Sequence, residues 1–215
     1  KIGTNILIQD EKNPSLKIGF EICEDLWVPL APSTNTALLG ATITANLSAS
    51  NEIVGKASYR RTLVSAQSAK NISAYIYANA GNSESTTDLV FSGHSIIAEN
   101  GTILAEKKPF EDKILYAEID FERLSHERIK TTTFASCAIE NQKQKNQPAR
   151  IIKINLLKDE TENQIKNKTG QNFDKNKKDS TKNGSESLKL ERKISPYPFV
   201  PQDENSRRER CMEVV

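Results

Sequence analysis

The sequence has few cysteines, few histidines and no cysteine pair of the CxxC type. Its three cysteines, Cys23, Cys137 and Cys211, are widely spaced, which argues against a disulfide framework or a cysteine-rich zinc site. A Ser-His-Asp triad or a histidine metal site would have to use His94 or His126, and neither residue has ligand-like spacing. We therefore expect no metal or cofactor in this segment, and the unpaired thiols favour a reducing, cytoplasmic location.

Long apolar runs and a strong net charge are also missing. No run comes near the roughly 18 apolar residues of a membrane-spanning helix, and no signal peptide is visible, so we expect no membrane contact. The formal net charge is +2, which gives no whole-chain reason to expect nucleic acid. Hydrophobic residues make up 36% of the 215 positions, below the usual share for a compact domain, so part of the chain is expected to lie outside any core.

Residues 1–130 alternate between strand-like and helix-like segments, which predicts an α/β layered domain rich in β-structure. Strands are predicted at Asn5–Gln9, Leu16–Ile22, Thr42–Ser48, Ile72–Ala80 and Lys113–Asp120. Helices are predicted at Pro32–Ala41 (capped by Ser33 or Thr34 and ended by Gly40), Gly55–Asn71 and Phe121–Ile129. His94–Glu106 predicts a hairpin with a type I′ turn at Asn100-Gly101.

The composition changes after about residue 141. Ala149–Leu157 predicts one more strand, but residues 163–187 hold only Ile165 and Phe173 as large apolar side chains. Such a segment cannot offset a backbone ordering cost of about 1–2 kcal/mol per residue, so we predict a disordered Lys/Asn-rich insertion at residues 158–190. Residues 141–192 carry 13 Lys/Arg against 7 Asp/Glu; a solvated insertion is our interpretation, and a basic interaction tail is the alternative.

Residues 191–215 begin with three prolines in six residues, which predicts a stiff, extended connector. The following residues predict the first turns of a helix capped by Asp203 or Ser206. Because this helix ends before its apolar side is complete, and because the first residue is not Met, we expect the native protein to extend beyond this chain at both ends.

The segment KIGFEICEDLWVPL, Lys17–Leu30, ends a predicted strand at a cysteine. Such a strand delivers Cys23 to the carboxyl edge of a sheet, where α/β folds collect their sites. A sharp bend at the next residues would expose the sulfur and aim backbone N–H groups as an oxyanion hole requires. A buried structural cysteine is the alternative, and no histidine lies nearby in the sequence to activate the thiol.

Several segments together resemble a known family. The resemblance is to the carbon–nitrogen hydrolase (nitrilase-type) glutaminase domain of glutamine-dependent NAD⁺ synthetases, in the order and spacing of GFEICEDLWVP, GATITANLSASN, GKASYRRTLVSAQSAK, AYIYANAGNSESTTDLVFSGHS, ENGTILAE and SPYPFVPQDENSRRERC. It covers nearly all of residues 1–135 and resumes near Arg192. It implies an α/β fold of the α-β-β-α sandwich type. Residues 1–157 would be the C-terminal half of that domain, and residues 191–215 the linker and the start of the synthetase domain.

The resemblance implies a Cys nucleophile, a Glu general base and a Lys that stabilises the oxyanion. Cys23 matches the nucleophile, and the backbone N–H of Glu24 would be the second oxyanion donor. Ser50 and Trp27 match positions that contact glutamine. Lys56 matches a position that binds the α-carboxylate, where arginine also occurs, although Lys offers a point charge and not a bidentate fork. From local sequence alone the alternatives are a core role for Trp27, a helix cap for Ser50 and a surface charge for Lys56.

The chain departs from the family in lacking the other catalytic motifs. Only 22 residues precede Cys23, none resembles the Glu or Lys motif, and Glu11, Lys12 and Lys17 lie in or beside a predicted hairpin turn. The SGG-x-DS loop of the ATP-binding synthetase domain does not occur either. We therefore expect an internal piece of a longer enzyme that cannot hydrolyse glutamine by itself.

The resemblance also implies the partners of the parent enzyme. Ammonia released from glutamine would amidate deamido-NAD⁺, with ATP and Mg²⁺ bound in the synthetase domain, within a homo-oligomer. The polar loop Ser83–Gly93 would shape the pocket rim or the ammonia route, or its hydroxyls would only satisfy loop backbone. The alternative functions are a stand-alone nitrilase-type amidase with another amide substrate, and a catalytically incomplete assembly module.

Overall fold

The computed structural model describes residues 5–144, 149–156, 190–194 and 203–213, without the side chains of residues 144 and 213. The chain divides into two compact units, residues 1–183 and 184–215. Residues 158–189 of the predicted insertion and residues 195–202 of the predicted connector lie outside the described residues. In the second unit α6 (Glu204–Glu213) begins as predicted, because Asp203 Oδ1 accepts a hydrogen bond from the Ser206 N–H at 2.8 Å.

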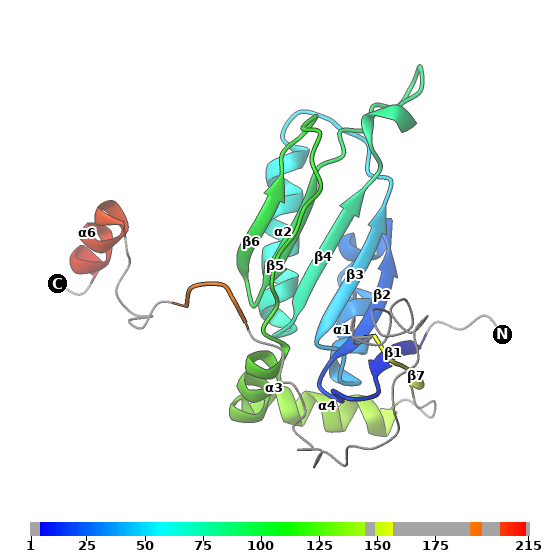
Figure 1. Ribbon diagram of the computed structural model, residues 1–215, viewed down its shortest axis with the longest axis vertical. Helices are drawn as coiled ribbons and strands as arrows, with labels where there is room; N and C mark the ends of the chain where they lie inside the picture. Colours follow the sequence, from blue (N-terminus) through cyan, green and yellow to red (C-terminus); the bar gives the residue numbers. More distant parts are fainter. Residues whose placement is uncertain (1–4, 145–148, 157–189, 195–202, 214–215) are drawn as a thin grey trace, which may run out of the picture. The chain divides into compact units, whose positions relative to one another are not determined.

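Seven strands form one mixed sheet in the first unit (Figure 1). They are β1 (Ile6–Asp10), β2 (Lys17–Ile22), β3 (Ile43–Ser48), β4 (Ala74–Asn79), β5 (Ser95–Glu99), β6 (Thr102–Lys107) and β7 (Arg150–Ile154). Their order is β6-β5-β4-β3-β2-β1-β7. Strands β2, β3 and β4 run parallel, as do β1 and β7, and the other neighbours are antiparallel. The carboxyl ends of β2, β3 and β4 therefore meet at one end of the sheet.

Helices α1 (Pro32–Leu38) and α2 (Lys56–Lys70) connect the parallel strands and lie on one face of the sheet (Figure 1). Helices α3 (Phe121–Lys130) and α4 (Thr132–Gln144) pack on each other near the amino ends of those strands. The 3₁₀ helices η1 (Cys23–Trp27) and η2 (Asn82–Glu84) follow β2 and β4, respectively. This arrangement leaves the carboxyl ends of the parallel strands to loops and to η1, which is where a site can form.

The main core lies between the sheet and α2. It consists of Leu26, Val64, Tyr75, Tyr77, Ile96 and Ala98, with Trp27, Leu63 and Ile103 packed against it. A second cluster, Leu16, Ile43, Ala74 and Leu124, joins α3 to the other face of the sheet. The alternation of strand residues toward these two faces is the period of two that the sequence pattern predicts.

The rest of that second face is uncovered in the described residues. Phe20, Ile22 and Leu47 are 37%, 67% and 61% exposed. The parallel register aligns Ile22 with Leu47 in one row and Phe20 with Ala45 and Ile76 in the next, so these apolar side chains form one surface. One helical layer and one sheet with an open apolar face are what half of an α-β-β-α sandwich contains.

Most predicted elements are confirmed to within a few residues. In the hairpin of β5 and β6, Asn100 and Gly101 have φ of 46° and 86°, as a type I′ turn requires. The predicted side-chain cap of α1 is wrong: α1 starts at Pro32 with Ala31 before it and has no side-chain cap, because proline is pre-organised for the first helical position. Helix α4 was not predicted, since its start carries a run of threonines, which are poor helix formers.

The predicted strand Lys113–Asp120 is wrong. The segment has no regular secondary structure, and its side chains at Ile114 and Tyr116 are 76% and 78% exposed. Strand β6 forms one edge of the described sheet and pairs only with β5 there. An alternating pattern becomes a strand only when a neighbouring strand supplies hydrogen bonds, and none is supplied to this segment in the described sheet.

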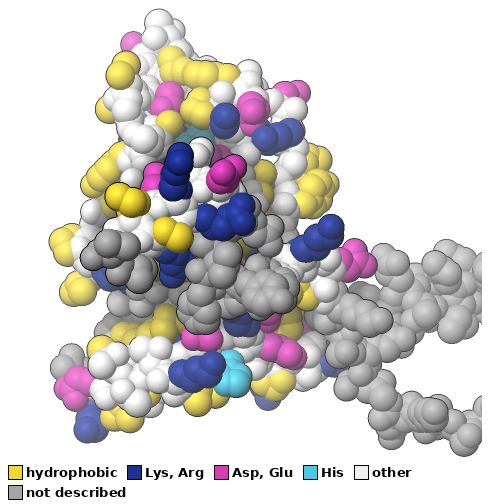
Figure 2. Space-filling view, turned by 90° about the vertical axis from the view of Figure 1, so that its left-hand side faces the viewer, with side chains coloured by type: hydrophobic (Ala, Val, Ile, Leu, Met, Phe, Trp, Pro, Cys, Tyr) yellow, Lys and Arg dark blue, Asp and Glu magenta, His cyan; other side chains and the backbone are white. Residues whose placement is uncertain are grey.

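The surface shows no large area of one charge in the view of Figure 2. Lys and Arg side chains are interspersed with Asp and Glu on that face of the molecule, in keeping with the small net charge of +2. In the part of the chain that the structure describes, no helix has the length and apolar character needed to cross a membrane.

Arg128 of α3 ties the carboxyl ends of α1 and α2 together. Its guanidinium donates to the carbonyls of Ala41 (2.7 Å), Asn71 (2.8 Å), Ile72 (2.9 Å) and Ala37 (3.4 Å). These carbonyls lie at or just past the carboxyl ends of α1 and α2, where partners within the helix run out; the Ala37 carbonyl also accepts from the Gly40 N–H at 2.9 Å. The side chain is 9% exposed, and burial lowers the pKa of Arg128 to about 10, which still leaves it charged at neutral pH.

We expect Arg128→Met to lower the free energy of unfolding by about 2–3 kcal/mol, because several buried carbonyls lose their donor. Urea denaturation of the 215-residue chain measures this. Arg123→Met, on the exposed side of the same helix, is the matched control and should change stability by less than about 0.5 kcal/mol. Equal stability of the two variants would contradict the role of Arg128.

Candidate active site

Cys23 lies at a sharp turn between β2 and η1. The strand ends at Ile22, and Cys23 has a φ of 49°, in the left-handed region that a non-glycine residue rarely adopts. The Ile22 N–H donates to Asp25 Oδ2 at 2.8 Å, which holds the turn from the side of η1. The cysteine is partly buried and not paired with another cysteine. A strained residue that the surrounding structure holds in place is a frequent feature of functional sites.

The side chain of Asn46 on β3 holds the backbone of Cys23. Asn46 Oδ1 accepts from the Cys23 N–H at 3.1 Å, and Asn46 Nδ2 donates to the Cys23 carbonyl at 3.4 Å. Ser48 Oγ also donates to Asn46 Oδ1, at 2.8 Å. Asn46 is 1% exposed, so this amide stays fixed, and it pins the cysteine in its left-handed conformation.

Two further buried groups orient Asn46. Asn46 Nδ2 donates to the Tyr75 hydroxyl at 3.0 Å, and that hydroxyl donates in turn to Glu21 Oε1. Burial first, and the Glu21 carboxylate second, raise the pKa of Tyr75, so the hydroxyl keeps the proton that it donates. Glu21 Oε2 accepts from the Ser33 N–H of α1 at 2.7 Å. The chain of contacts therefore connects α1 to the turn at Cys23.

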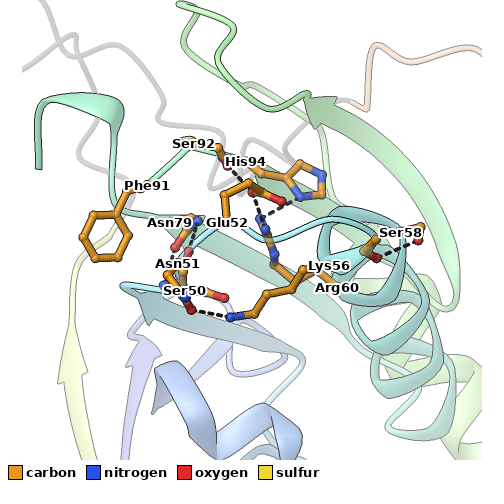
Figure 3. A network of polar contacts seen from close by, with 12 residues as sticks. Ser50, Asn51, Glu52, Lys56, Ser58, Arg60, Asn79, Phe91, Ser92 and His94 are labelled. Carbon is orange, nitrogen blue, oxygen red and sulfur yellow. Dashed lines mark hydrogen bonds and ion pairs between the residues drawn. The ribbon is translucent and has the colours of Figure 1, made fainter. Parts of the chain in front are cut away.

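Ser50 follows β3 at the same end of the sheet. Asn79, the last residue of β4, holds its backbone: Asn79 Oδ1 accepts from the Ser50 N–H at 2.8 Å, and Asn79 Nδ2 donates to the Ser50 carbonyl at 3.1 Å (Figure 3). The Ser50 hydroxyl is buried near the Tyr77 hydroxyl, and neither group has a hydrogen bond of full geometry within the described residues. Since a buried hydroxyl without a partner is costly, this oxygen is available to bind a substrate.

Trp27, Tyr59 and Lys56 come together where η1 meets the first turn of α2. The Trp27 and Tyr59 rings have centroids 5.2 Å apart, and Lys56 Nζ lies 5.5 Å from the Trp27 ring centroid. Lys56 Nζ also donates to Asn51 Oδ1 at 2.6 Å (Figure 3). Aromatic contact and an amide oxygen fix the ammonium while leaving it donors to spare, which suits an anionic group such as a carboxylate.

The comparisons with known proteins agree with this geometry. Residues 3–128 match the family model of the carbon-nitrogen hydrolases. The chain belongs to the carbon–nitrogen hydrolase family. The Glutamine-dependent NAD(+) synthetase of Mycobacterium bovis is 44% identical over 134 residues, which cover 61% of this chain and 20% of that protein. The Mycobacterium leprae protein of the same name is 33% identical over 213 residues, which cover 98% of this chain and 28% of that protein.

The carbon–nitrogen hydrolase fold is also seen in a solved structure. The carbon-nitrogen hydrolase from Helicobacter pylori G27 aligns with a TM-score of 0.52 and 24% identity over 68% of this chain and 55% of that chain, which shows a shared fold. The resemblance to the glutaminase domain of glutamine-dependent NAD⁺ synthetases is thereby confirmed. The chain spans less than a third of the length of these two mycobacterial relatives.

The structure of this carbon–nitrogen hydrolase brings most predicted site residues to one end of the sheet. Cys23, Glu24 and Trp27 are in η1, Ser50 is in the loop after β3, and Lys56 is the first residue of α2. The Glu24 side chain is exposed, so only its backbone N–H is offered for the predicted oxyanion role. The roles of all five residues remain predictions.

The acidic and basic residues upstream of Cys23 lie elsewhere. Glu11 and Lys12 are in the turn between β1 and β2, and Lys17 begins β2 while Cys23 follows its end. A strand of six residues spans about 20 Å, so these three side chains start at the opposite end of the strand from the thiol. They cannot replace the catalytic Glu and Lys of the family.

Three residues that sequence reasoning missed now support the site: Asn46, Tyr75 and Asn79. A signal was present, because Asn46 and Tyr75 interrupt apolar strand patterns with polar atoms on the face that becomes buried. A buried amide needs partners, but the sequence does not say that the partner is the backbone of Cys23. In the part of the chain that the structure describes, no cluster of His, Cys, Asp and Glu could hold a metal ion.

Proposed function

We propose that this chain is the nucleophile-bearing part of the glutaminase module of a glutamine-dependent NAD⁺ synthetase. The observation that carries the proposal is the strained turn at Cys23, held by Asn46 at the same end of the sheet as Ser50. The names of the mycobacterial relatives point to glutamine as the amide substrate. In this proposal residues 1–157 belong to the module, residues 158–190 are an insertion, and residues 191–215 lead into the synthetase domain.

In the proposed reaction the Cys23 thiolate attacks the side-chain carboxamide carbon of glutamine. A Glu outside this chain takes the thiol proton and passes it to the leaving nitrogen, so the C–N bond breaks and ammonia departs. Water then cleaves the glutamyl thioester and frees Cys23. Dividing hydrolysis into two displacements lowers each barrier. The Glu24 N–H and a Lys outside this chain would stabilise the oxyanion, and one such donor is typically worth about 10²–10³ in rate.

Binding of the amino acid portion of glutamine falls to the residues around η1 and α2. The Lys56 ammonium would bind the α-carboxylate, and the Ser50 hydroxyl would take a polar group of the substrate as its missing partner. Trp27 would close the pocket against water on the side of α2. Because Lys56 is already positioned by Asn51 and Trp27, little side-chain freedom would be lost on binding.

The remaining partners belong to the proposed parent enzyme. Ammonia would reach a synthetase domain that uses ATP and Mg²⁺ to amidate deamido-NAD⁺, in a cytoplasmic homo-oligomer. The described residues contain no cluster suited to a metal ion, and none of the steps assigned to this chain runs through ATP or Mg²⁺.

Two substrates and two proteins test the proposed function. The complete protein that contains this chain should release ammonia from glutamine much faster than from asparagine, and mass spectrometry should find a glutamyl adduct on Cys23. The 215-residue chain alone should release none detectably. Preference for another amide would instead favour a stand-alone amidase. Robust turnover by the chain alone that Cys23→Ala abolishes would show that the external Glu and Lys are dispensable.

A further inference from the structure

The loop at residues 49–55 carries Ser50 and Asn51 and leads into Lys56, yet it has little apolar contact to hold it. It contains no helix or strand, and its apolar side chains Ile53 and Val54 are 59% and 106% exposed. Asn79 secures the loop at Ser50. The middle of the loop is secured by Glu52, whose N–H donates to the Val90 carbonyl at 2.7 Å.

The Glu52 side chain enters a buried polar network (Figure 3). Glu52 Oε2 accepts from Arg60 Nη2 and from the Ser92 hydroxyl, the latter at 2.5 Å. Burial favours the neutral acid, but the two hydrogen bonds and the Arg60 charge outweigh it and lower the pKa of Glu52. Arg60 is 0% exposed and the Glu52 side chain is 14% exposed, so the buried Arg60 charge depends on Glu52 for its balance.

His94 completes the network from the other side of Arg60. Arg60 Nη1 lies 3.0 Å from His94 Nδ1, and His94 Nε2 lies 3.1 Å from Glu106 Oε1. A guanidinium can only donate hydrogen bonds, so Nδ1 must accept and Nε2 must carry the proton. The His94 ring thus links Arg60 to Glu106 on β6. Both terminal nitrogens of the Arg60 guanidinium, Nη1 and Nη2, therefore contact a partner.

Arg60 is also one helical turn after Lys56 on α2 (Lys56–Lys70). Residues four apart lie on the same side of a helix, so a shift of the Arg60 side chain would disturb the turn that presents Lys56. Through Glu52 the same guanidinium fixes the loop that presents Ser50 and Asn51. One buried side chain therefore connects to the segments that present Ser50 and Lys56.

We propose that Arg60 is a positioning residue that sets the affinity for glutamine by holding the loop at residues 49–55 and the first turn of α2. We assign it no contact with a reacting atom, because its Nη1 and Nη2 atoms contact His94 and Glu52; its Nε is buried without a hydrogen-bond partner in the described residues. The proposal rests on the proposed function for the identity of the ligand, and on the structure for the network itself.

Arg60→Lys tests the proposal in the complete protein. Lysine keeps the charge beside Glu52 but cannot also reach His94 with a planar fork. We expect the KM for glutamine to rise about tenfold while kcat at saturating glutamine changes by less than about twofold. Arg123→Lys is the matched control, since Arg123 is exposed on α3 and lies outside this network, and it should leave KM unchanged. Arg61 is unsuitable because it pairs with Glu106. Ser92→Ala removes the hydroxyl that donates to Glu52 and accepts from the His94 N–H at 3.4 Å. It leaves Arg60 in place, so it reports on the loop even if Arg60→Lys folds poorly. We expect a KM increase of about threefold.

Hydrogen exchange of the 215-residue chain supplies a readout that does not depend on glutamine. Arg60→Lys should speed exchange at residues 49–55, whereas Arg123→Lys should not. An unchanged KM in Arg60→Lys would overturn the proposal. Equal changes of kcat and KM in Arg60→Lys and in its control variant would also overturn it. If the wild-type protein hydrolyses no glutamine, the proposed function fails by itself, and unchanged exchange in Arg60→Lys would then overturn the positioning role.

Discussion

Cys23→Ala is expected to lower glutamine-dependent NAD⁺ formation by the complete protein at least about 10⁴-fold, because the nucleophile that forms the thioester is gone. The ammonia-dependent rate should be kept, since the proposed synthetase domain would receive ammonia directly. The two rates are measured on the same preparation, with glutamine or with an ammonium salt as the nitrogen source. A selective loss separates the glutaminase step from the rest of the enzyme.

Cys137→Ala is the matched control for that experiment. Cys137 is an exposed, unpaired cysteine of α4, and the site contains no residue of that helix, so both rates should be unaffected. If Cys23→Ala and Cys137→Ala behave alike, or if Cys23→Ala removes both activities, the assignment of Cys23 as nucleophile is contradicted. Cys23→Ser adds a further check, because a hydroxyl of similar size attacks much more weakly than a thiolate.

Local chemistry explains which parts of the fold could be predicted. Asn and Gly both tolerate the positive φ that a type I′ turn requires, and Asn100 and Gly101 adopt it. The hairpin was therefore predictable from these two residues. Lys113–Asp120 has an equally good alternating pattern, but its fate depends on whether a neighbouring strand is present, which is a non-local fact. The first turn of α1 shows a similar limit, since Ser33 offers its N–H to Glu21 and not its side chain to the helix end.

The site divides in the same way. The position of Cys23 at the end of a strand was predictable, because an apolar strand pattern ends there in a polar turn, whereas its role as the nucleophile stays a prediction. The side chains that hold Cys23 in place could not be predicted, because they come from distant parts of the sequence. Asn46 contacts Cys23 across 23 positions, and Glu21 contacts Tyr75 across 54 positions. Sequence alone shows that such polar residues need partners, while the parallel register of β2, β3 and β4 decides which partners they obtain.

Asn46 is therefore the residue whose replacement should matter most after Cys23 itself. Asn46→Leu keeps the approximate size but removes the acceptor for the Cys23 N–H and the donor to the Cys23 carbonyl. The left-handed backbone conformation of Cys23 then loses the two hydrogen bonds from the Asn46 side chain that stabilise it. Because a misplacement of about 1 Å can cost about 10²-fold, and the Glu24 N–H moves with the turn, we expect kcat for glutamine to fall about 10²- to 10³-fold.

Thr44→Val separates this effect from a general loss of packing. Thr44 lies on the same strand and face as Asn46, it is 0% exposed, and its hydroxyl has no partner in the described residues. Replacing that hydroxyl with a methyl group should leave kcat and KM unchanged and should not reduce stability. Asn46→Leu should cost about 2 kcal/mol of stability as well, so kcat is compared at a temperature where circular dichroism shows both variants fully folded. A normal kcat in folded Asn46→Leu would mean that Asn46 stabilises the sheet without positioning the nucleophile.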